Sequence, residues 1–364
     1  MAHQRTNNFA LVLLGLLMAG SAYVLIEYVW SLPAEKVVAA VYYKSLAVFY
    51  LPWLDFFRNS IFTIAFWCAI VLTLILQRLA PAKPEQKIFS PGFAQDLVWF
   101  FYQTILHALI IATYVDLLAH LYSKHVSFLT ITYLNQLPGW LRFLLAALLV
   151  DLLYWGQHYC NHKVPLLWKL HSLHHSQREL NFFTDFRYHF LEYIVRHTFL
   201  VIPLSILKVE PPVIIAFGIF RQWYVRFYHG NIKTDLGLLR YILVTPQSHR
   251  VHHSVEPAHR DTNFGSILSI WDFALGTQYR NYDVYPDTGI QDQSFPHEKT
   301  VRLRSLLLTP FNQLLYPFLR TSKPGILVAE SPPLGSAGPT LVPDSGEPAN
   351  PVISEGLTYQ RAKE

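Results

Sequence analysis

The chain of 364 residues contains few cysteines, few methionines and few charged residues. Its two cysteines, Cys68 and Cys160, exclude a disulfide-stapled scaffold and a metal site built from CxxC pairs. Charged residues make up only 15% of the sequence, whereas soluble domains average about 25%. This shortage of charge argues against an ordinary cytosolic globular protein.

Apolar residues are abundant instead, at 52% of the chain, and 15% of the residues are aromatic. Such hydrophobicity excludes intrinsic disorder for most of the sequence, because disorder requires low hydrophobicity and high net charge. The net charge of +5 is modest. In a membrane protein it is typical of cytoplasmic loops and not of a nucleic-acid-binding surface, so no nucleic-acid partner is expected.

Long apolar stretches predict membrane-spanning helices, since a span needs roughly 20 mostly apolar residues. Six stretches qualify: Phe9–Trp30, Ser60–Gln77, Leu97–Leu121, Trp140–Gln157, Phe190–Leu207 and Pro212–Tyr228. The first could alternatively be a cleaved signal peptide. A seventh stretch, Val37–Phe57, is interrupted by Lys44 and Pro52 and is either a span or an interfacial segment. The expected fold class is all-α, a multi-span membrane helical bundle.

The distribution of Lys and Arg predicts the orientation of this bundle. With six spans and a cytoplasmic N-terminus, eight basic residues lie in inner loops and five in outer loops, before the long segment that follows Tyr228. Residues 321–364 are rich in proline and lack apolar periodicity, which predicts a disordered C-terminal tail. With this topology, the clustered histidines of the chain lie on the cytoplasmic face.

Eleven of the 17 histidines lie within the 96 residues from His158 to His253. They include an HxxxH box at His158–His162 and two HxxHH boxes, at His171–His175 and His249–His253. Residues i and i+4 share one helix face, so each box directs two imidazoles to one point. An HxxHH box also has a histidine next to one member of this pair. It is rotated by about 100° around the helix axis from that neighbour and can reach a second ion. Eight box histidines exceed the ligands of one ion, so the boxes predict a histidine-rich cap that binds two metal ions.

Other polar residues near the boxes are harder to assign. His189 and His229 flank the predicted hairpin on the same side as the boxes, and each is either a ligand or a neighbour of one. His197 lies deeper, and we expect it to be a packing or hydrogen-bonding residue. Asp151 lies two turns before His158, where it either hydrogen-bonds a box histidine or pairs with Arg142. Outside this cluster, His107, His120, His125, His259 and His297 are expected not to bind metal.

The residue types leave the metal open, because imidazole binds zinc, iron, copper and nickel. A zinc-dependent lipid hydrolase would need a carboxylate base, for which Glu179, Asp185 and Glu192 are candidates. An iron site would perform oxygen chemistry. A non-enzymatic divalent-metal carrier is a further alternative, although only His107, Asp116 and His120 hint at a polar path through the spans.

The order of these motifs resembles the fatty acid hydroxylase / sterol desaturase superfamily, which are integral membrane non-heme di-iron oxygenases. The resemblance covers Asp151–Gly276. It runs from the HxxxH box through the first HxxHH box, Asn181, the Arg-Tyr-His-Phe-Leu-Glu run at 187–192 and His229 to the second HxxHH box and Asp261-Thr-Asn263-Phe-Gly265. One departure is Tyr159, where family members often carry an arginine after the first histidine.

The resemblance implies a catalytic domain over residues 96–320, preceded by N-terminal spans and a basic loop over 1–95. It implies O2-dependent hydroxylation or desaturation of an unactivated C–H bond in a membrane lipid or sterol. Two iron ions would be the cofactors, with zinc possible in isolated protein. Because no flavin, haem or iron–sulfur motif is visible, a cytochrome, ferredoxin or pterin would donate electrons.

The same resemblance implies which residues form the centre. The implied ligands are His158, His162, His171, His174, His175, His229, His249, His252 and His253, with His189 as a tenth candidate. Asp151, Asn181, Asp261 and Asn263 are implied as residues that support the ligands or the loops that carry them.

Overall fold

The computed structural model describes residues 60–106, 112–209, 211–292 and 294–319. These residues form helices, short helical turns and three isolated bridges, with no strand among them, which confirms the all-α prediction for this part of the chain. The helices are α3 (Ser60–Leu79), α4 (Pro91–Leu106), α5 (Ala112–Leu121), α6 (Gly139–Lys163), α7 (Pro165–His175), α8 (Phe190–Ile206), α9 (Pro211–His229), α10 (Pro246–His252), α11 (Ile270–Leu275) and α12 (Leu303–Leu319).

One helix in the described residues, α6, is long and apolar enough to cross a membrane. The bounds of α3, α8 and α9 coincide closely with three other predicted spans, while the predicted span at 97–121 is described as α4 and α5. The predicted segments Phe9–Trp30 and Val37–Phe57 and the tail at 321–364 lie outside the described residues. A multi-span bundle therefore stays a prediction.

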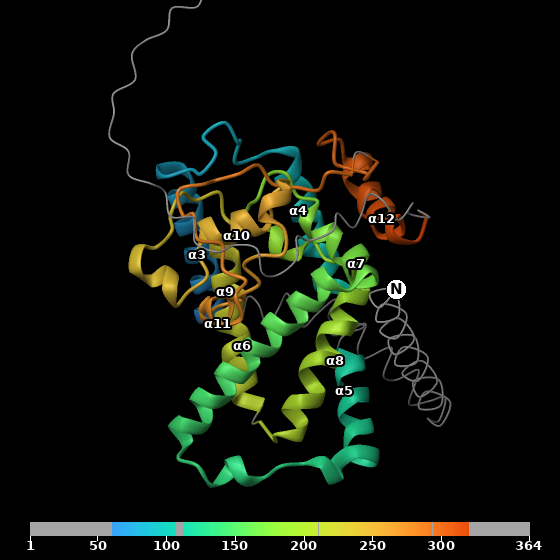
Figure 1. Cartoon of the computed structure of the whole chain (residues 1–364). Coiled ribbons are helices and arrows are strands. Elements are labelled where there is room, and N and C mark those ends of the chain that lie inside the picture. The colour runs from blue at the N-terminus through green and yellow to red at the C-terminus, as the bar shows by residue number, and fades with distance from the viewer. Residues whose placement is uncertain (1–59, 107–111, 210, 293, 320–364) are drawn as a thin grey trace, which may run out of the picture. The chain divides into compact units, whose positions relative to one another are not determined.

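Helices α6, α8 and α9 pack around one apolar core, and α5 lies along α8. The buried residues of this core are Val150, Leu200, Leu204, Phe217 and Ile267. Figure 1 shows α5, α6 and α8 extending to the same side of the level at which α7 and α10 lie. The two helices that carry the HxxHH boxes are thus placed at one end of the long helices.

Local sequence explains why α7 and α10 begin where they do. Each has a proline in its first turn, Pro165 in α7 and Pro246 in α10. Proline fits this position because its fixed φ is helical and its missing N–H would have no partner there. In α10 the side chains of Thr245 and Ser248 also bond each other's backbone N–H groups in a capping box. Both box helices therefore have a well-defined N-terminal end.

Asp151 fixes the loop that follows α10 and does not bond a histidine. Its carboxylate accepts hydrogen bonds from the N–H groups of Ile267 and Leu268, at 3.0 and 3.1 Å, and from the indole of Trp271 at 2.9 Å. These three donors include neither a box histidine nor Arg142, the two partners expected from the sequence. Three donors on one buried carboxylate hold the loop against α6.

Asp272 holds the same loop from its other end. It accepts hydrogen bonds from Trp155 of α6, from the backbone N–H groups of Phe264 and Gly265, and from Thr277. A side chain at Gly265 would bring its Cβ within 2.9 Å of the Asp272 carboxylate, so only glycine permits this close approach. The loop that carries Phe264 is thereby fixed beside the first histidine box.

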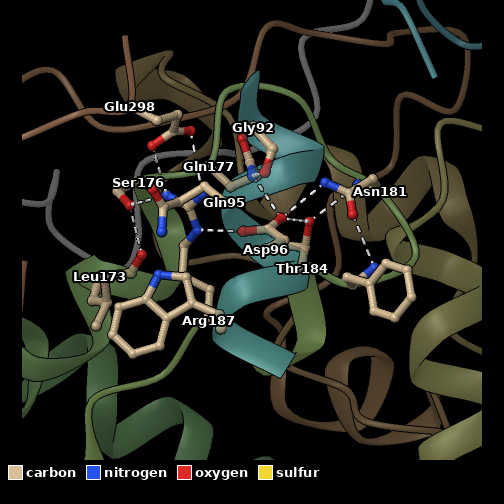
Figure 2. Close-up of polar contacts among 12 residues, drawn as sticks. Gly92, Gln95, Asp96, Leu173, Ser176, Gln177, Asn181, Thr184, Arg187 and Glu298 are labelled. Atoms are coloured by element: carbon tan, nitrogen blue, oxygen red, sulfur yellow. Dashed lines mark hydrogen bonds and ion pairs between the residues drawn. The ribbon is translucent and has the colours of Figure 1, made fainter. Parts of the chain in front are cut away.

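A second buried network, centred on Asp96 of α4, holds the segment after α7 (Figure 2). Asp96 accepts hydrogen bonds from Arg187 at 2.6 Å, Gln177 at 2.6 Å, Asn181 at 2.8 Å and Thr184 at 2.9 Å. Asn181 thus supports the loop between α7 and α8, and its side chain bonds Asp96 instead of a histidine.

Arg187 joins this network to the end of α7 and to the C-terminal part of the fold. Its two terminal nitrogens bond both carboxylate oxygens of Glu298 at 3.2 Å, and one also bonds Ser176 at 3.3 Å. The Ser176 hydroxyl in turn donates to the carbonyl of Leu173 in α7. Arg187 is fully buried, so its positive charge is compensated by the carboxylates of Asp96 and Glu298 instead of by water.

We predict that Arg187→Ala strongly destabilises the fold, because it leaves Asp96 and Glu298 without their cation. Loss of one partner of a buried ion pair costs about 3–5 kcal/mol. Thermal unfolding of the detergent-solubilised protein measures the effect. The matched control is Arg178→Ala, since Arg178 is exposed. Equal melting temperatures for the two variants would contradict the role given to the Asp96 network.

Candidate metal centre

Nine of the ten predicted histidine ligands lie in two compact groups. In each group, one nitrogen per imidazole lies within 4.8 Å of the corresponding nitrogens of the others. Group one contains His158, His162, His171, His175 and His252, and group two contains His174, His229, His249 and His253. Seven of the nine are buried, and the two on α6 are partly buried.

The division between the groups follows helical spacing. Each i, i+4 pair stays together, as His171 and His175 do in group one. The middle histidine of each HxxHH box belongs to the other group: His174 joins group two and His252 joins group one. The groups are therefore adjacent, and the rings of His175 and His253 stack with centroids 4.3 Å apart.

Several imidazoles are anchored through the nitrogen that faces away from the group. The Nδ1 atoms of four histidines contact acceptors on the surrounding chain: His158 with Phe264 O at 3.0 Å, His252 with Thr262 O at 2.8 Å, His229 with Val225 O at 2.7 Å and His171 with the Glu192 carboxylate at 3.0 Å. Carbonyl and carboxylate oxygens only accept hydrogen bonds, so Nδ1 carries the proton. In a neutral imidazole, Nε2 then carries an unshared lone pair that can bind a metal ion.

These lone pairs converge at close range. The Nε2 atoms of His158 and His171 are 3.1 Å apart, and those of His229 and His249 are 2.9 Å apart. With both Nδ1 atoms of the first pair protonated, two lone pairs face each other there, and a cation between them removes the repulsion. Buried ring nitrogens of His252 and His253 also have no hydrogen-bond partner among the described residues. The residues present therefore fit metal ions.

Burial keeps four histidines in or next to α7 and α10 neutral. Burial lowers the pKa of His252 to about 3, and it holds the pKa of His174, His175 and His253 well below the usual range, with neighbouring imidazoles adding to the effect. Neutral imidazole is the form that binds a metal ion. At neutral pH these residues require no deprotonation before they bind one.

Glu192, at the start of α8, is a supporting residue that the sequence reasoning placed only among possible bases. One oxygen of its carboxylate contacts His171 Nδ1 at 3.0 Å, Asn161 Nδ2 at 2.8 Å and Arg196 at 3.3 Å. A carboxylate that accepts the outer N–H of a ligand histidine fixes its tautomer and orientation. The signal in the sequence was its place in the Arg-Tyr-His-Phe-Leu-Glu run, one helical turn after His189.

Tyr188 connects Arg196 to group two. Its ring stacks on His174 with centroids 4.3 Å apart and planes 10° apart, and the Arg196 guanidinium lies 4.5 Å from the same ring. Arg196 therefore contacts supports of both groups, Glu192 beside group one and Tyr188 beside group two. The spacing of the histidine boxes does not predict that Arg196 contacts both Glu192 and Tyr188.

Asp261 lies beside the HxxxH box, and Asn263 lies beside the second HxxHH box. Asp261 Oδ1 is 3.7 Å from His162 Nδ1, and its other oxygen pairs with Lys163 at 2.5 Å. Asn263 donates to the carbonyl of Ser248 in α10 at 2.8 Å. Both residues have positive φ, near 58°, a conformation that Asp and Asn tolerate better than most residues.

His189, which was expected as a tenth ligand, lies outside both groups. Its Nδ1 accepts from the Leu191 N–H as the N-cap of α8, and its Nε2 contacts the carbonyl of Leu314 at 3.2 Å. Both ring nitrogens are thus engaged in holding helices. His197 is also outside the groups, and its Nδ1 contacts the carbonyl of Tyr193.

Comparison with known proteins identifies the segment that carries the groups. Residues 143–277 match the fatty acid hydroxylase family. Over these residues the chain is similar to fatty acid hydroxylases. The match confirms the resemblance to the fatty acid hydroxylase / sterol desaturase superfamily, and it contains all nine grouped histidines.

The chain is also similar to individual proteins that are named as a monooxygenase and a lipid hydroxylase. The chain is 34% identical to alkylglycerol monooxygenase of Danio rerio over 45% of its own length and 35% of the relative's. It is 32% identical to the ornithine lipid hydroxylase OlsE of Rhizobium tropici, over 39% of this chain and 43% of the relative. The chain spans less than half the length of these curated relatives. No solved structure was found to match it.

We predict that metal content distinguishes grouped histidines from His189. His249→Ala removes one of four imidazoles from group two and should lower the metal content of purified protein. His189→Asn keeps a good helix cap and should leave the metal content unchanged. Elemental analysis of both variants gives the answer, and equal loss of metal would contradict the assignment of His189.

We also predict that Glu192 sets the metal affinity of group one. Glu192→Ala removes the acceptor that orients His171, and loss of such a support typically lowers metal affinity about 10- to 100-fold. Competition with a chelator measures this affinity. The control is Glu179→Gln, because the Glu179 carboxylate bonds the Gly92 N–H and no grouped histidine. Unchanged chelator competition in Glu192→Ala would refute the orienting role.

Proposed function

We propose that this chain hydroxylates an unactivated C–H bond of a membrane lipid with O2, at two iron ions held by group one and group two. The observation that carries the proposal is the pair of adjacent all-imidazole groups within a fatty acid hydroxylase domain. Imidazole ligands bind iron as well as zinc, copper and nickel, and the similarity to fatty acid hydroxylases favours iron among these metals.

A zinc-dependent hydrolase is less well supported. It would need a carboxylate base next to the metal, and two of the candidates are otherwise engaged. Glu192 bonds His171, Asn161 and Arg196, while Glu179 bonds the Gly92 N–H. The names of the relatives, a monooxygenase and a lipid hydroxylase, also favour oxygen insertion.

The residues of this chain would hold and shield the centre. The two irons, when bound, would supply reductive activation of O2. Burial of seven of the nine histidines excludes bulk water, while Glu192, Asp261 and the backbone carbonyls keep the imidazoles oriented. Electrons would come from a separate cytochrome, ferredoxin or pterin donor.

We further propose that the site lies at the cytoplasmic end of a multi-span bundle. Helix α6 meets the length and hydropathy of a span, and exposed Phe143, Leu144 and Leu145 near its far end suit contact with lipid. His158 and His162 lie at the opposite end of this helix. An acyl chain in the bilayer would thereby have access to the centre. Among lipids and sterols, the relatives' names favour a lipid with a polar head group.

The test is to express the chain, compare lipid extracts with those of an empty host and measure bound metal. We expect two irons per chain and a lipid whose mass has increased by one oxygen atom, derived from labelled O2. His252→Ala should abolish the product. Stoichiometric zinc together with oxygen-independent lipid cleavage would overturn the proposal, and loss of two hydrogens instead of oxygen gain would make the enzyme a desaturase.

A further inference from the structure

Helix α12 presents a stripe of exposed apolar side chains that the proposed site does not use. Leu303, Leu307, Phe311, Leu315 and Phe318 are between 49% and 71% exposed. Their spacing of three or four residues places them along one side of the helix. A contiguous apolar patch on a surface marks a site of interaction with a membrane or another protein.

The opposite side of α12 is fixed to the fold. Leu314 is buried in a cluster with Trp99 of α4 and Leu173 of α7. The Trp99 indole donates to Gln313 at 3.0 Å, and the Gln95 side chain donates to the carbonyl of Leu306. The stripe is therefore held outward by a packed helix, which Figure 1 shows beside α4.

The charges around the stripe indicate what covers it. Lys299, Arg302 and Arg304 at the start of α12 are exposed, and residues 299–319 contain no Asp or Glu. With 17 residues and two internal prolines, α12 does not meet the criteria for a membrane span. An apolar face next to basic residues is typical of helices that lie in the plane of an anionic membrane surface.

We propose that α12 is an in-plane membrane-binding helix, whose stripe enters the interfacial region of an anionic bilayer while Lys299, Arg302 and Arg304 contact lipid head groups. The helix packs on Leu173, which lies between His171 and His174. Membrane contact by α12 therefore sets the level of α7 and its histidines relative to the bilayer. This role does not depend on the reaction that the histidine groups catalyse.

The test uses the full chain in nanodiscs and an environment-sensitive fluorophore on single cysteines. Cys68 and Cys160 are first replaced by alanine. Leu307→Cys, Phe311→Cys and Leu315→Cys each report on the stripe, Glu256→Cys reports on an exposed loop, and Phe143→Cys reports on the candidate span. We expect the stripe labels to emit at shorter wavelength than the Glu256→Cys label. Lipids with a quencher near the head group should quench them several-fold more strongly.

Two outcomes would overturn the proposal. Stripe labels that behave like the Glu256→Cys label would show that the stripe faces water. Blue-shifted stripe labels that lipid quenchers do not reach would show a protein partner, and a dependence on protein concentration in detergent would identify a second copy of the chain.

Head-group charge provides an independent arm. Arg302→Gln combined with Arg304→Gln should reduce lipid quenching of the Phe311→Cys label in nanodiscs that contain phosphatidylglycerol, and should have little effect in pure phosphatidylcholine. The Phe143→Cys label serves as the control, because it should be unaffected by both substitutions. An equal effect in both lipids would refute the electrostatic part of the proposal.

Discussion

The described structure depends on one constraint: nine imidazoles direct their nitrogens into two adjacent buried spaces. Neutral imidazoles crowded at about 3 Å repel one another through their lone pairs unless a cation lies between them. The chain counters this repulsion by anchoring the far side of the rings, through backbone carbonyls and the Glu192 carboxylate. The site is thus preorganised by groups that never face a metal ion.

The rest of the fold can be understood as support for these anchors. Asp151 and Asp272 hold the loop that supplies the Phe264 carbonyl. Arg187 and Asp96 hold the segment that leaves α7. Buried carboxylates in this domain therefore serve mainly to fix backbone segments. Polar groups of this kind are costly to bury unless fully bonded, so each replacement should have a large effect.

Some of this was predictable from the sequence. The i, i+4 spacing within each box placed histidines on one helix face, and the crossing of His174 and His252 follows from the same geometry. His229 could be considered as a ligand because it ends a predicted helix on the same side as the histidine boxes. Asp151 was expected as a supporting residue, but the partners of the supports could not be predicted, since Asp151 and Glu192 bond residues that are distant in sequence. The position of His189 in the motif does not reveal that both of its ring nitrogens contact backbone groups of α8 and α12.

The central claim is that the two histidine groups hold two separate ions. Anomalous X-ray diffraction from crystals of the iron-loaded protein, measured at the iron edge, tests it most directly. The account predicts two iron peaks, one among His158, His162, His171, His175 and His252, and one among His174, His229, His249 and His253. A single peak, or iron bound at histidines outside these groups, would contradict it.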